Sequence, residues 1–424
     1  MKIKPIQKLR SGALQFTVFI SVLIALLLSG LILYAYTFTY FKEQSKATID
    51  IIQLSESGIN YILHHDIEFD TLEIEDLEAN NRKVKVNLSN WGMFNKVTAI
   101  AFHRKKAFKR IALLGGLNDS EMASTLYLAE SYNPLTIVGN TKIEGNVFLP
   151  SQGVKPGYIG GQSYYGSQLI YGKSSKSDLK LPEINTQSIT TIDNYLNDLE
   201  PINAEEKNSI PNNQLHNSFK ENTKYIISNN DIILNNIELI GNIIVKSARK
   251  ITISKSTNIK DIILIAPEIV IEDDVKGTFQ AIANKGILLG KNCKLNYPSA
   301  LILWDNPKIA VMDKLEDKIK IDKNSQINGV VCYFNRDQKI SNFNPRIILE
   351  EESKIKGQVY CQGSFELKGT VSGSVFTKEF VANQAGSTFV NHIYNGIIEN
   401  NSIPKKYGGL LFEDNPKIIA KWMY

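Results

Sequence analysis

Residues 11–41 read SGALQFTVFISVLIALLLSGLILYAYTFTYF, and this run contains no Asp, Glu, Lys or Arg. An α-helix rises about 1.5 Å per residue, so roughly 20 apolar residues cross the hydrocarbon core of a bilayer. The run is longer than that, which predicts a retained transmembrane helix over residues 13–41. Two alternatives stay open: a cleaved signal peptide, which would have a shorter apolar region and a small-residue cleavage site, and a buried core helix.

The charges on either side of this run predict its orientation. A basic leader at residues 1–12 carries four cations: Lys2, Lys4, Lys8 and Arg10. The nearest cation after the run is Lys42, which stands beside Glu43. An excess of positive charge keeps its flank in the cytoplasm. We therefore expect a single-pass protein of a bacterial inner membrane, with the lipid bilayer as a partner, the N-terminus cytoplasmic and the bulk of the chain periplasmic.

The composition gives little sign of a nucleic-acid-binding or metal-binding protein. The 424 residues leave room for an anchor and about two folded units, and the formal net charge is only +5. The densest basic run, His103-Arg104-Lys105-Lys106, predicts a solvated strand or hairpin, with an anion contact as the alternative. The cysteines, Cys293, Cys332 and Cys361, have no spacing typical of a metal site.

Helical spacing continues beyond the apolar run. Apolar residues recur mostly three or four positions apart at Ile51, Leu54, Ile59, Ile62 and Leu63, which is typical of an amphipathic helix. The sequence between residues 44 and 63 contains no proline and one glycine. We therefore expect residues 42–65 to extend the membrane helix and to pack on a folded unit.

The start of the chain resembles a known family. The basic leader ends in Ser11-Gly12, Ala13-Leu14 opens the apolar helix, and Ser55-Glu56-Ser57-Gly58 follows where the helix would leave the membrane. Over about residues 1–63 this pattern resembles type IV pilin-like proteins, particularly minor pilins and pseudopilins. The resemblance implies cleavage after Gly12, a new N-terminus at Ala13, and packing of the helix with other pilin-like or envelope proteins. Thr17 stands where the family usually has glutamate, and a generic single-pass anchor is the alternative.

Residues 66–134 predict a small, mostly antiparallel β unit. Residues 83–88 alternate polar and apolar side chains as a half-buried strand does, and residues 97–102 and 110–114 are further strand candidates. Gly115-Gly116 and Asn118-Asp119 are typical of turns. Residues 124–130 are expected to add a short strand to the same unit.

The strongest internal signal is an apolar-x-Gly-x-apolar pattern within residues 135–400. It occurs at Ile143-Gly145-Val147, Leu239-Gly241-Ile243, Ile327-Gly329-Val331, Ile355-Gly357-Val359, Leu367-Gly369-Val371 and Val371-Gly373-Val375. Residues 318–331 align with residues 346–359 at a shift of 28, and the triplets Ile251-Thr252-Ile253, Ile269-Val270-Ile271 and Ile287-Leu288-Leu289 recur every 18 residues. Such short β repeats cannot bury their own apolar faces, so they predict a stacked solenoid. Glycine suits the bends between strands, where positive φ is needed.

The predicted fold class is therefore mainly β: a transmembrane helix, a small antiparallel unit, and a single-stranded parallel β-helix over residues 135–400. The coils, especially residues 355–375, resemble bactofilin-like β-helices, which form polymers; a β-sandwich or a series of hairpins is the alternative. We expect residues 161–224 to form a polar surface insertion and residues 335–345 to form a loop. Residues 401–424 are expected to cap the last coil or to pack back on the body.

Candidate residues for chemistry are few. Asp273-Asp274 and Glu350-Glu351-Glu352 could supply the acids of a polysaccharide-cleaving site, but both follow an inward strand directly, where a solvated turn is expected. His64-His65-Asp66 predicts an exposed helix end. No hydrolase, metalloprotease or nucleotide-binding motif is present. We predict no catalytic, metal-binding or cofactor-binding residue, and the site prediction is the processing position at Gly12 and Ala13.

The repeat also predicts the state of two cysteines. In the 28-residue alignment, Cys332 falls opposite Tyr360 and Cys361 falls opposite Tyr333. Side chains alternate between the two faces of a strand, so the cysteines should lie on opposite faces of adjacent strands. A disulfide between them is not expected, even in an oxidising compartment.

These features predict a membrane-anchored structural or assembly protein of the bacterial cell envelope that is not an enzyme. By resemblance it would be a minor pilin or pseudopilin of a type IV pilus-like or type II secretion-like machine. Two hypotheses stay open beside it: a membrane-tethered β-helix that binds or cleaves envelope polysaccharide, and a bactofilin-like scaffold that polymerises. Neither a cofactor nor a nucleic acid is expected as a partner.

Overall fold

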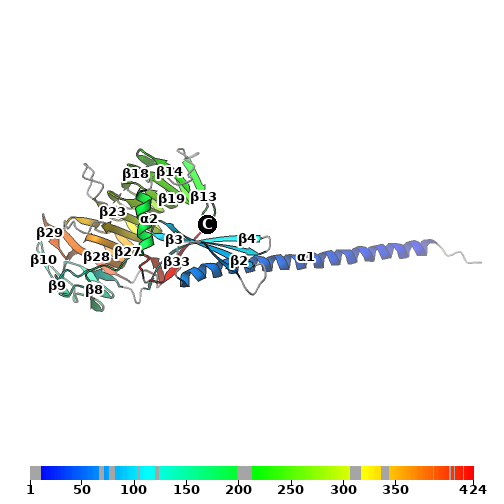
Figure 1. Ribbon diagram of the computed structural model, residues 1–424, viewed down its shortest axis with the longest axis horizontal. Coiled ribbons are helices and arrows are strands. Elements are labelled where there is room, and N and C mark those ends of the chain that lie inside the picture. Colours follow the sequence, from blue (N-terminus) through cyan, green and yellow to red (C-terminus); the bar gives the residue numbers. More distant parts are fainter. Residues whose placement is uncertain are drawn as a thin grey trace, which may run out of the picture.

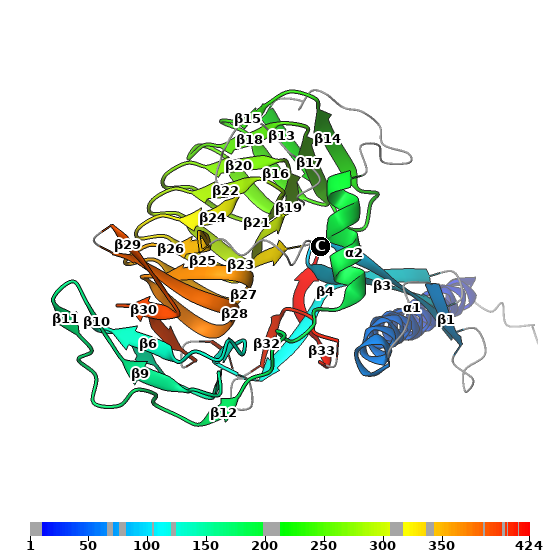
Figure 2. The ribbon, with the colours of Figure 1, turned by 60° about the vertical axis from the view of Figure 1, so that its left-hand side comes forward.

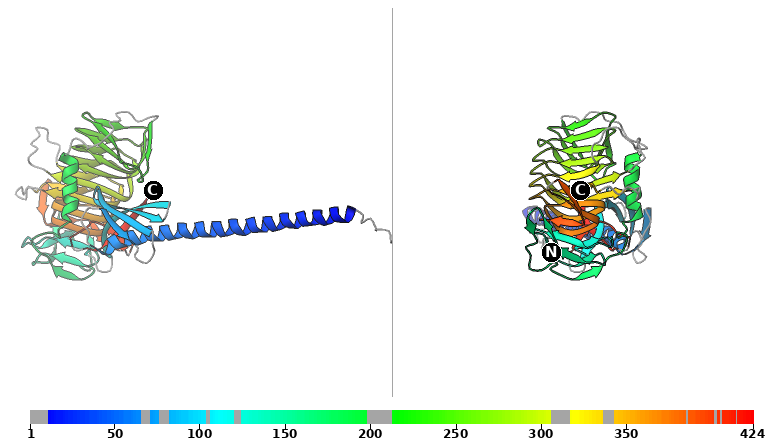
Figure 3. Two further views of the ribbon diagram at one scale, coloured as in Figure 1. Left: turned by 45° about the vertical axis from the view of Figure 1, so that its right-hand side comes forward. Right: turned by 90° about the vertical axis from the view of Figure 1, so that its left-hand side faces the viewer.

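A long helix projects from a β-rich body (Figures 1 and 3). This computed structural model describes residues 11–65, 71–75, 82–103, 106–119, 124–197, 213–305, 317–335, 343–384, 386–400, 403–404, 406–413 and 415–424. Within these ranges the chain is mainly β, with one long apolar helix at the N-terminal end, large parallel sheets and a smaller antiparallel sheet. The predicted fold class is confirmed at this level.

The helix α1 spans Ser11–His64 without a break. Its 54 residues give a length of about 80 Å. The segment Gly12–His64 is long and apolar enough to cross a membrane, and its most apolar window has a mean hydropathy of 2.7. Side chains in the first half of α1, as far as Phe41, are exposed. This half therefore has no protein covering among the described residues.

An antiparallel sheet packs beside the second half of α1. Its strands are β1 (Thr71–Glu75), β2 (Arg82–Trp91), β3 (Phe94–His103), β4 (Lys106–Asp119), β32 (Lys406–Gly409) and β33 (Lys417–Met423). The first four pair in sequence order, and both C-terminal strands pair with β4. The ends of the basic run, His103 and Lys106, pair across β3 and β4, and residues 104–105 between them lie outside the described residues. The tail thus extends this sheet, and its Leu410, Phe412 and Met423 pack back on the body, which is the second of the two expected arrangements.

The predicted apolar face of α1 packs on this sheet. All five of its residues belong to one core with the sheet: Ile51, Leu54, Ile59, Ile62 and Leu63. Gly58 lies at the closest approach, where a Cβ would be 2.9 Å from Cγ2 of both Val84 and Val86. Absence of a side chain at Gly58 therefore lets the helix lie directly against β2.

One prediction for the antiparallel unit is wrong. Gly115-Gly116 and Asn118-Asp119 are not turns, because they lie inside β4 and pair with the C-terminal strands. A Cβ on Gly116 would lie 2.2 Å from the carbonyl oxygen of Leu410. These glycines therefore permit a close backbone approach, which single-sequence reading cannot tell apart from a turn.

The body contains three ladders of parallel strands on which successive turns of the chain stack (Figure 2). The first ladder holds, in spatial order, β13 (Gln214–Asn217), β16 (Glu238–Gly241), the first parts of β19 (Asn258–Ile265), β21 (Lys276–Ala283), β23 (Lys294–Asp305), β25 (Gln326–Asn335), β27 (Lys354–Leu367) and β28 (Thr370–Gln384), then β31 (Ile397–Glu399) and β7 (Lys142–Ile143).

The second ladder holds β14 (Lys224–Ser228), β17 (Ile243–Ser247), the continuations of β19, β21, β23, β25, β27 and β28, then β5 (Leu126–Leu128), β8 (Val147–Leu149) and β12 (Ser174–Lys176). The third holds β15 (Ile232–Leu234), β18 (Lys250–Ile253), β20 (Glu268–Ile271), β22 (Gly286–Leu289), β24 (Lys318–Ile321), β26 (Pro345–Leu349) and the ends of β27 and β28. A separate sheet of β30 (His392–Tyr394), β6 (Leu135–Val138) and β9 (Val154–Pro156) stacks after the end of β28, where the Asn391 amide donates to Phe380 O.

The strand register matches the predicted repeats. Ile251 pairs with Ile269 and Ile269 with Ile287, at the shift of 18 residues. Ile319 pairs with Ile347, at the shift of 28. These residues belong to a single core enclosed by the ladders, in which identical side chains stack turn upon turn. Most of the loop predicted after Asn335 lies at residues 336–342, outside the described residues.

Glycines stack at the bend between the first and second ladders. Gly329 pairs with Gly357, and Gly357 pairs with Gly373. Their φ angles are +150°, +144° and +143°, which L side chains rarely adopt. A Cβ on Gly357 would also lie 1.9 Å from Gly329 O. The prediction that glycine occupies bends with positive φ is confirmed at these three positions. Another residue would be strained at this φ angle, and its Cβ would clash with the backbone of the neighbouring turn.

The chain does not pass through the stack in sequence order. Val375 of β28 pairs with Leu126 of β5, and Ile398 of β31 pairs with Ile143 of β7. The turns formed by residues 125–177 therefore continue the stack beyond residue 399, and Figure 2 shows their teal strands beside the orange ones. The strand expected at residues 124–130 thus belongs to the body, and its assignment to the antiparallel unit is wrong.

The polar stretch at residues 161–224 is also more than the surface insertion expected from the sequence. It begins in β11 (Gln162–Ser163), which pairs with β10 (Tyr158–Ile159), and includes β12 at one end of the stack. The helix α2 (Thr186–Asn197) follows along the side of the body, and the stretch ends at β13 and β14 at the opposite end (Figure 2). Between these, residues 198–212 lie outside the described ranges.

The outer face of the second ladder is buried as well. Ile302 and Cys332 of this face share a core with Phe94 and Leu113 of the antiparallel sheet and with Ile192 of α2. Strands that are covered on both faces show continuous apolar runs instead of alternation, as in ALILW at residues 300–304. The antiparallel sheet and α2 are therefore fixed to the same side of the body.

Candidate functional site

The predicted processing position lies at the exposed start of α1. Gly12 is the second residue of the helix, and a Cβ there would meet no atom within 4 Å. Ala13 follows it in the same turn and is exposed. Residues 1–10 of the leader lie outside the described residues. The bond between Gly12 and Ala13 thus lies at the end of α1 farthest from the body, without tertiary contacts to the described part of the chain (Figure 1).

The acids singled out in the sequence lie in separate surface turns. Asp274 follows β20, has a φ of +63° and pairs with Lys255 at 3.1 Å, while Asp273 Oδ1 accepts the Lys291 amide at 2.7 Å. Glu351 follows β26 and pairs with Lys323 at 2.8 Å. Side-chain hydrogen bonds from these lysines lower the pKa of Asp274 and Glu351, so both carboxylates are ionised at neutral pH.

Lysine side chains are the ion-pair partners of Asp274, Glu350 and Glu351 among the described residues. Glu350 is bonded to Lys368 at 3.3 Å, in the turn next to Glu351. Across the described ranges, no group of three or more His, Cys, Asp or Glu side chains could hold a metal ion. His64 ends α1 and His65 follows it; both rings contact backbone carbonyls one turn earlier, and Asp66 lies outside the described residues. The structure therefore places these candidates apart, in solvated turns and at a helix end.

The two cysteines of the repeat lie as predicted. Cys332 pairs with Tyr360 and Cys361 with Tyr333 in adjacent strands. Cys361 belongs to the inner core and Cys332 to the outer one, and both are free thiols. The expectation that no disulfide joins them is confirmed.

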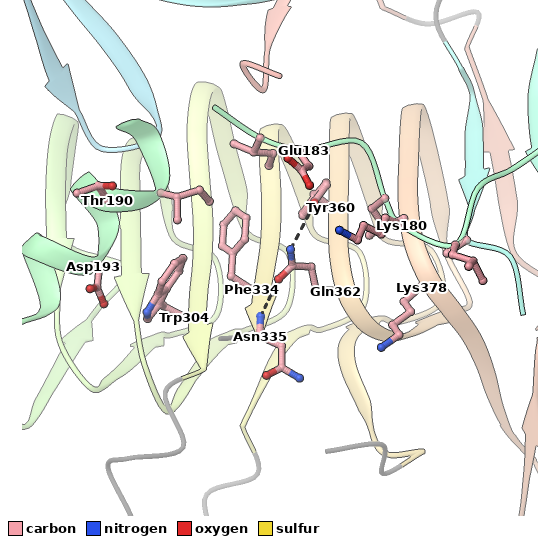
Figure 4. A pocket seen from close by; sticks show the side chains of 15 residues that line it. Lys180, Glu183, Thr190, Asp193, Trp304, Phe334, Asn335, Tyr360, Gln362 and Lys378 are labelled. Atoms are coloured by element: carbon pink, nitrogen blue, oxygen red, sulfur yellow. Dashed lines mark hydrogen bonds between the residues drawn. The ribbon is translucent and has the colours of Figure 1, made fainter. Parts of the chain in front are cut away.

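A cleft that the sequence did not reveal lies between α2 and the outer face of the second ladder. Its volume is about 540 Å³, and Figure 4 shows its lining side chains. Trp304, Phe334 and Tyr360 of β23, β25 and β27 form the floor. The wall consists of the segment at residues 179–184 and one side of α2.

The floor is a row of aromatic rings on successive strands. The ring centroids of Trp304 and Phe334 are 5.5 Å apart, as are those of Phe334 and Tyr360. The Tyr360 hydroxyl donates to Pro182 O at 3.1 Å, which ties the floor to the wall. Burial raises the pKa of Tyr360 to about 12, so its hydroxyl remains protonated at neutral pH.

Polar groups surround this aromatic floor. Gln362 accepts the Asn335 amide at 3.0 Å and contacts the Tyr360 hydroxyl at 3.4 Å. In Figure 4, Lys180 and Lys378 lie toward one end of the cleft, and Thr190 and Asp193 lie toward the other. The cleft therefore combines polar groups with an aromatic floor whose rings are almost fully buried, and whose neighbouring ring planes are tilted by 49° and 37°.

One sequence signal could have indicated this cleft. The runs at residues 300–304 and 330–334 are apolar at every position, so their outer face must be covered by another part of the chain. The antiparallel sheet and α2 both cover it, and α2 is separated from these strands by about 100 residues of sequence. No local pattern reports such a contact.

The fold and these sites define a mainly β protein with one long apolar N-terminal helix, a parallel-sheet body and an aromatic cleft. Comparisons of the chain with protein-family models, with curated proteins and with solved structures found no match.

Proposed function

We propose that the protein is a single-pass, membrane-anchored structural or assembly component of the bacterial cell envelope and that it is not an enzyme. The observation that carries the proposal is the division of α1 into two halves. The first half exposes its apolar side chains, whereas the second half buries Ile51, Ile59 and Ile62 against the sheet. Apolar side chains that no protein covers gain from transfer into lipid. The basic leader supports a cytoplasmic N-terminus and a periplasmic body.

We further propose that the body is a single-stranded parallel β-helix. In support, each turn between residues 214 and 380 contributes to the three ladders in the same order, and the next turn pairs with it in parallel. The stacked glycines at the first bend repeat in three successive turns. A solenoid of this kind gives a long, rigid surface without requiring a catalytic centre.

The pilin-like reading is the more specific form of the proposal. It is supported by a long helix whose exposed half is followed by a half packed on an antiparallel sheet. In this reading the leader is removed after Gly12, and the exposed half of α1 contacts other pilin-like or envelope proteins. The protein would then act by packing and recognition within a type IV pilus-like or type II secretion-like assembly.

A polymerising scaffold is the second candidate, and one observation favours it. The strands β13, β14 and β15 end the stack, and each pairs on one side only with a strand of the next turn within the described chain. Such open edges can pair with another copy. At the other end, Tyr164, Leu169 and Ile170 pack against the core and cover it.

The test is fractionation of native membranes followed by mass spectrometry of the N-terminus. The proposal predicts a protein that resists alkaline carbonate extraction and dissolves only in detergent. The pilin-like form predicts a mature chain that begins at Ala13. Recovery of the intact chain in the soluble fraction would refute the anchor, and a membrane-bound chain that retains its leader would refute the pilin-like form alone.

A further inference from the structure

The three ladders of the body differ in what their outer faces present. The outer face of the second ladder is buried under α2 and the antiparallel sheet. The outer face of the third ladder mixes charges with apolar groups, because Lys250 pairs with Glu268 at 3.0 Å and Val270 and Leu288 follow on the same face. The outer face of the first ladder instead carries lysines and amides over four successive strands.

The lysines of the first ladder form a row along the stack. In the strand register, Lys276 of β21 pairs with Lys294 of β23, Lys294 pairs with Gln326 of β25, and Gln326 pairs with Lys354 of β27. The residue before Lys276 and the residues after the other three belong to the inner core, so the row faces outward. Paired strands lie about 4.8 Å apart, which gives the row a length of about 14 Å.

A second, shorter row lies two residues further along the same strands. Asn328 of β25 pairs with Lys356 of β27, and Gln326 Nε2 donates to Asn328 Oδ1 at 2.8 Å. Two amides of β25 therefore stand between the lysines of β23 and those of β27. The two rows together form the basic face, which includes no acid and consists of Lys276, Lys294, Gln326, Asn328, Lys354 and Lys356.

The acids closest in sequence or in space to the basic face have lysine partners of their own. Asp274 precedes Lys276 by two residues and is bonded to Lys255 at 3.1 Å. Glu399, at one end of the face, is bonded to Lys354 at 3.5 Å. The remaining positive charge is therefore concentrated on the part of the face that Lys276 and Lys294 occupy.

The pairing of Lys276 with Lys294 is unfavourable in the isolated protein. Like charges directly opposite each other on adjacent strands destabilise a sheet. Both side chains are exposed, and neither forms an ion pair with another described residue. A ligand that carries a series of anions along the row would offset this repulsion. Such a ligand needs no fixed position for any single ammonium group, because it interacts with the field of the whole row.

The composition of the basic face favours one kind of polyanion. Single-stranded nucleic acids bind on aromatic side chains against which their bases stack, and the six residues of the face include no aromatic ring. The amides of Gln326 and Asn328 both donate and accept hydrogen bonds, as hydroxyl groups do. A polymer that carries carboxylates and hydroxyl groups therefore matches the lysines and the amides together.

We propose that the basic face binds a linear acidic polysaccharide that runs along the stack across β21, β23, β25 and β27. Its carboxylates lie at the lysines, and its hydroxyl groups lie at Gln326 and Asn328. This goes beyond the proposed function, because anchoring and assembly do not require the body to bind a glycan. The proposal concerns binding alone, and no covalent bond changes.

The experiment is isothermal titration of the full chain, in an uncharged detergent at low salt, with hexagalacturonate and separately with neutral maltohexaose. We expect saturable binding of hexagalacturonate that weakens as salt is added, and at least tenfold weaker binding of maltohexaose. Lys276→Gln combined with Lys294→Gln should weaken hexagalacturonate binding at least tenfold. Lys173→Gln combined with Lys176→Gln removes the same charge from exposed positions at β12 and should bind as the parent does.

Two further variants and a second ligand make the result specific. Lys276→Arg combined with Lys294→Arg keeps the charge and should retain binding. Lys276→Gln combined with Lys294→Gln should unfold at a temperature no lower than that of the parent, because it removes a repulsion; a lower temperature would contradict that repulsion. A thymidine hexanucleotide should bind more weakly than hexagalacturonate. Absence of saturable hexagalacturonate binding, undiminished binding in the Lys-to-Gln pair, or tighter binding of the oligonucleotide would overturn the proposal.

Discussion

The side-chain oxygen of Gln280 accepts a hydrogen bond from the Met93 amide over 2.8 Å. Its amide nitrogen donates to Trp91 O, also at 2.8 Å, so one side chain of the body closes the turn between β2 and β3. The turn residue Gly92 has a φ of +62°, and a Cβ there would lie 2.1 Å from the Gln280 oxygen. The antiparallel sheet is thus bonded to the body as well as packed on it.

This contact predicts a loss of stability in Gln280→Ala. Gln280 is buried, so the substitution leaves the amide of Met93 without the acceptor that it has here and removes one donor from the carbonyl of Trp91. A buried group left unsatisfied costs about 1–3 kcal/mol, so the free energy of unfolding should fall by about this amount. Denaturant unfolding in detergent measures it, with the exposed Gln187→Ala as the control. A decrease no larger than that of the control would contradict the role given to Gln280.

The contact of α1 with the sheet predicts a difference between two glycines of one helix. Gly58→Leu must push the helix away from Val84 and Val86, whereas a Cβ on Gly30 meets nothing within 4 Å. Overpacking of this kind costs about 1–3 kcal/mol. Hydrogen exchange should become faster in β2 and in α1 around Ile59 for Gly58→Leu and remain unchanged for Gly30→Leu. Equal protection in the two variants would show that α1 does not pack on the sheet in this way.

The stacked turns predict unreactive thiols. Cys293, Cys332 and Cys361 are all buried, and burial raises the pKa of each thiol, to about 11 for Cys293 and about 12 for Cys361. Because the thiolate is the reactive form, maleimide should label none of them in the native protein at pH 7.5 and all three after denaturation. Gel-shift counting of labelled cysteines measures this. Rapid native labelling, or a disulfide in the non-reduced protein, would be inconsistent with the strand register.

The same thiols predict a loss of stability in alkali. Their folded-state pKa values exceed the value of about 8.5 for an unfolded thiol, so below about pH 8 both states keep the proton and this contribution is constant. Between about pH 9 and pH 11 the unfolded chain loses protons that the folded chain keeps, and stability falls by about 1.4 kcal/mol per pH unit for each such group. Unfolding free energies measured across this range should show the decrease, with a smaller slope in Cys361→Ala. An unchanged slope in that variant would contradict the burial of Cys361.

Much of the body could be predicted because its repeats are local in sequence. Ile251, Ile269 and Ile287 lie one above another since each turn of the chain brings the same position back to the same ladder. The stacked glycines follow from the same periodicity, because a bend at one turn imposes the same bend on the next. The apolar face of α1 was predictable for a similar reason, since helical spacing alone assigns Ile59 and Ile62 to one side.

The stacking order of the turns, the role of Gly116 and the cleft could not be predicted, because they depend on contacts between distant segments that show no periodic pattern in the sequence. Val375 pairs with Leu126, which is about 250 residues away along the chain, and three-residue strands such as β5 carry too little pattern to reveal a partner. Gly116 lies in a strand, and its lack of a side chain lets the backbone at Leu410 approach closely. A glycine pair in a sequence indicates a turn equally well, so this role cannot be predicted. The cleft forms only when α2 lies beside Trp304 and Phe334. The sequence of α2 and the sequences of these strands do not predict that they are neighbours in the fold.

Labelling of an engineered cysteine tests the membrane topology most directly. Because all three native cysteines are buried, Tyr158→Cys would supply a single reactive thiol on the body, at a position that is 68% exposed. In intact spheroplasts, a membrane-impermeant maleimide should label this cysteine to the same extent before and after lysis, while a cytoplasmic marker protein is labelled only after lysis. Labelling of Tyr158→Cys only after lysis would place the body on the cytoplasmic side and contradict the account.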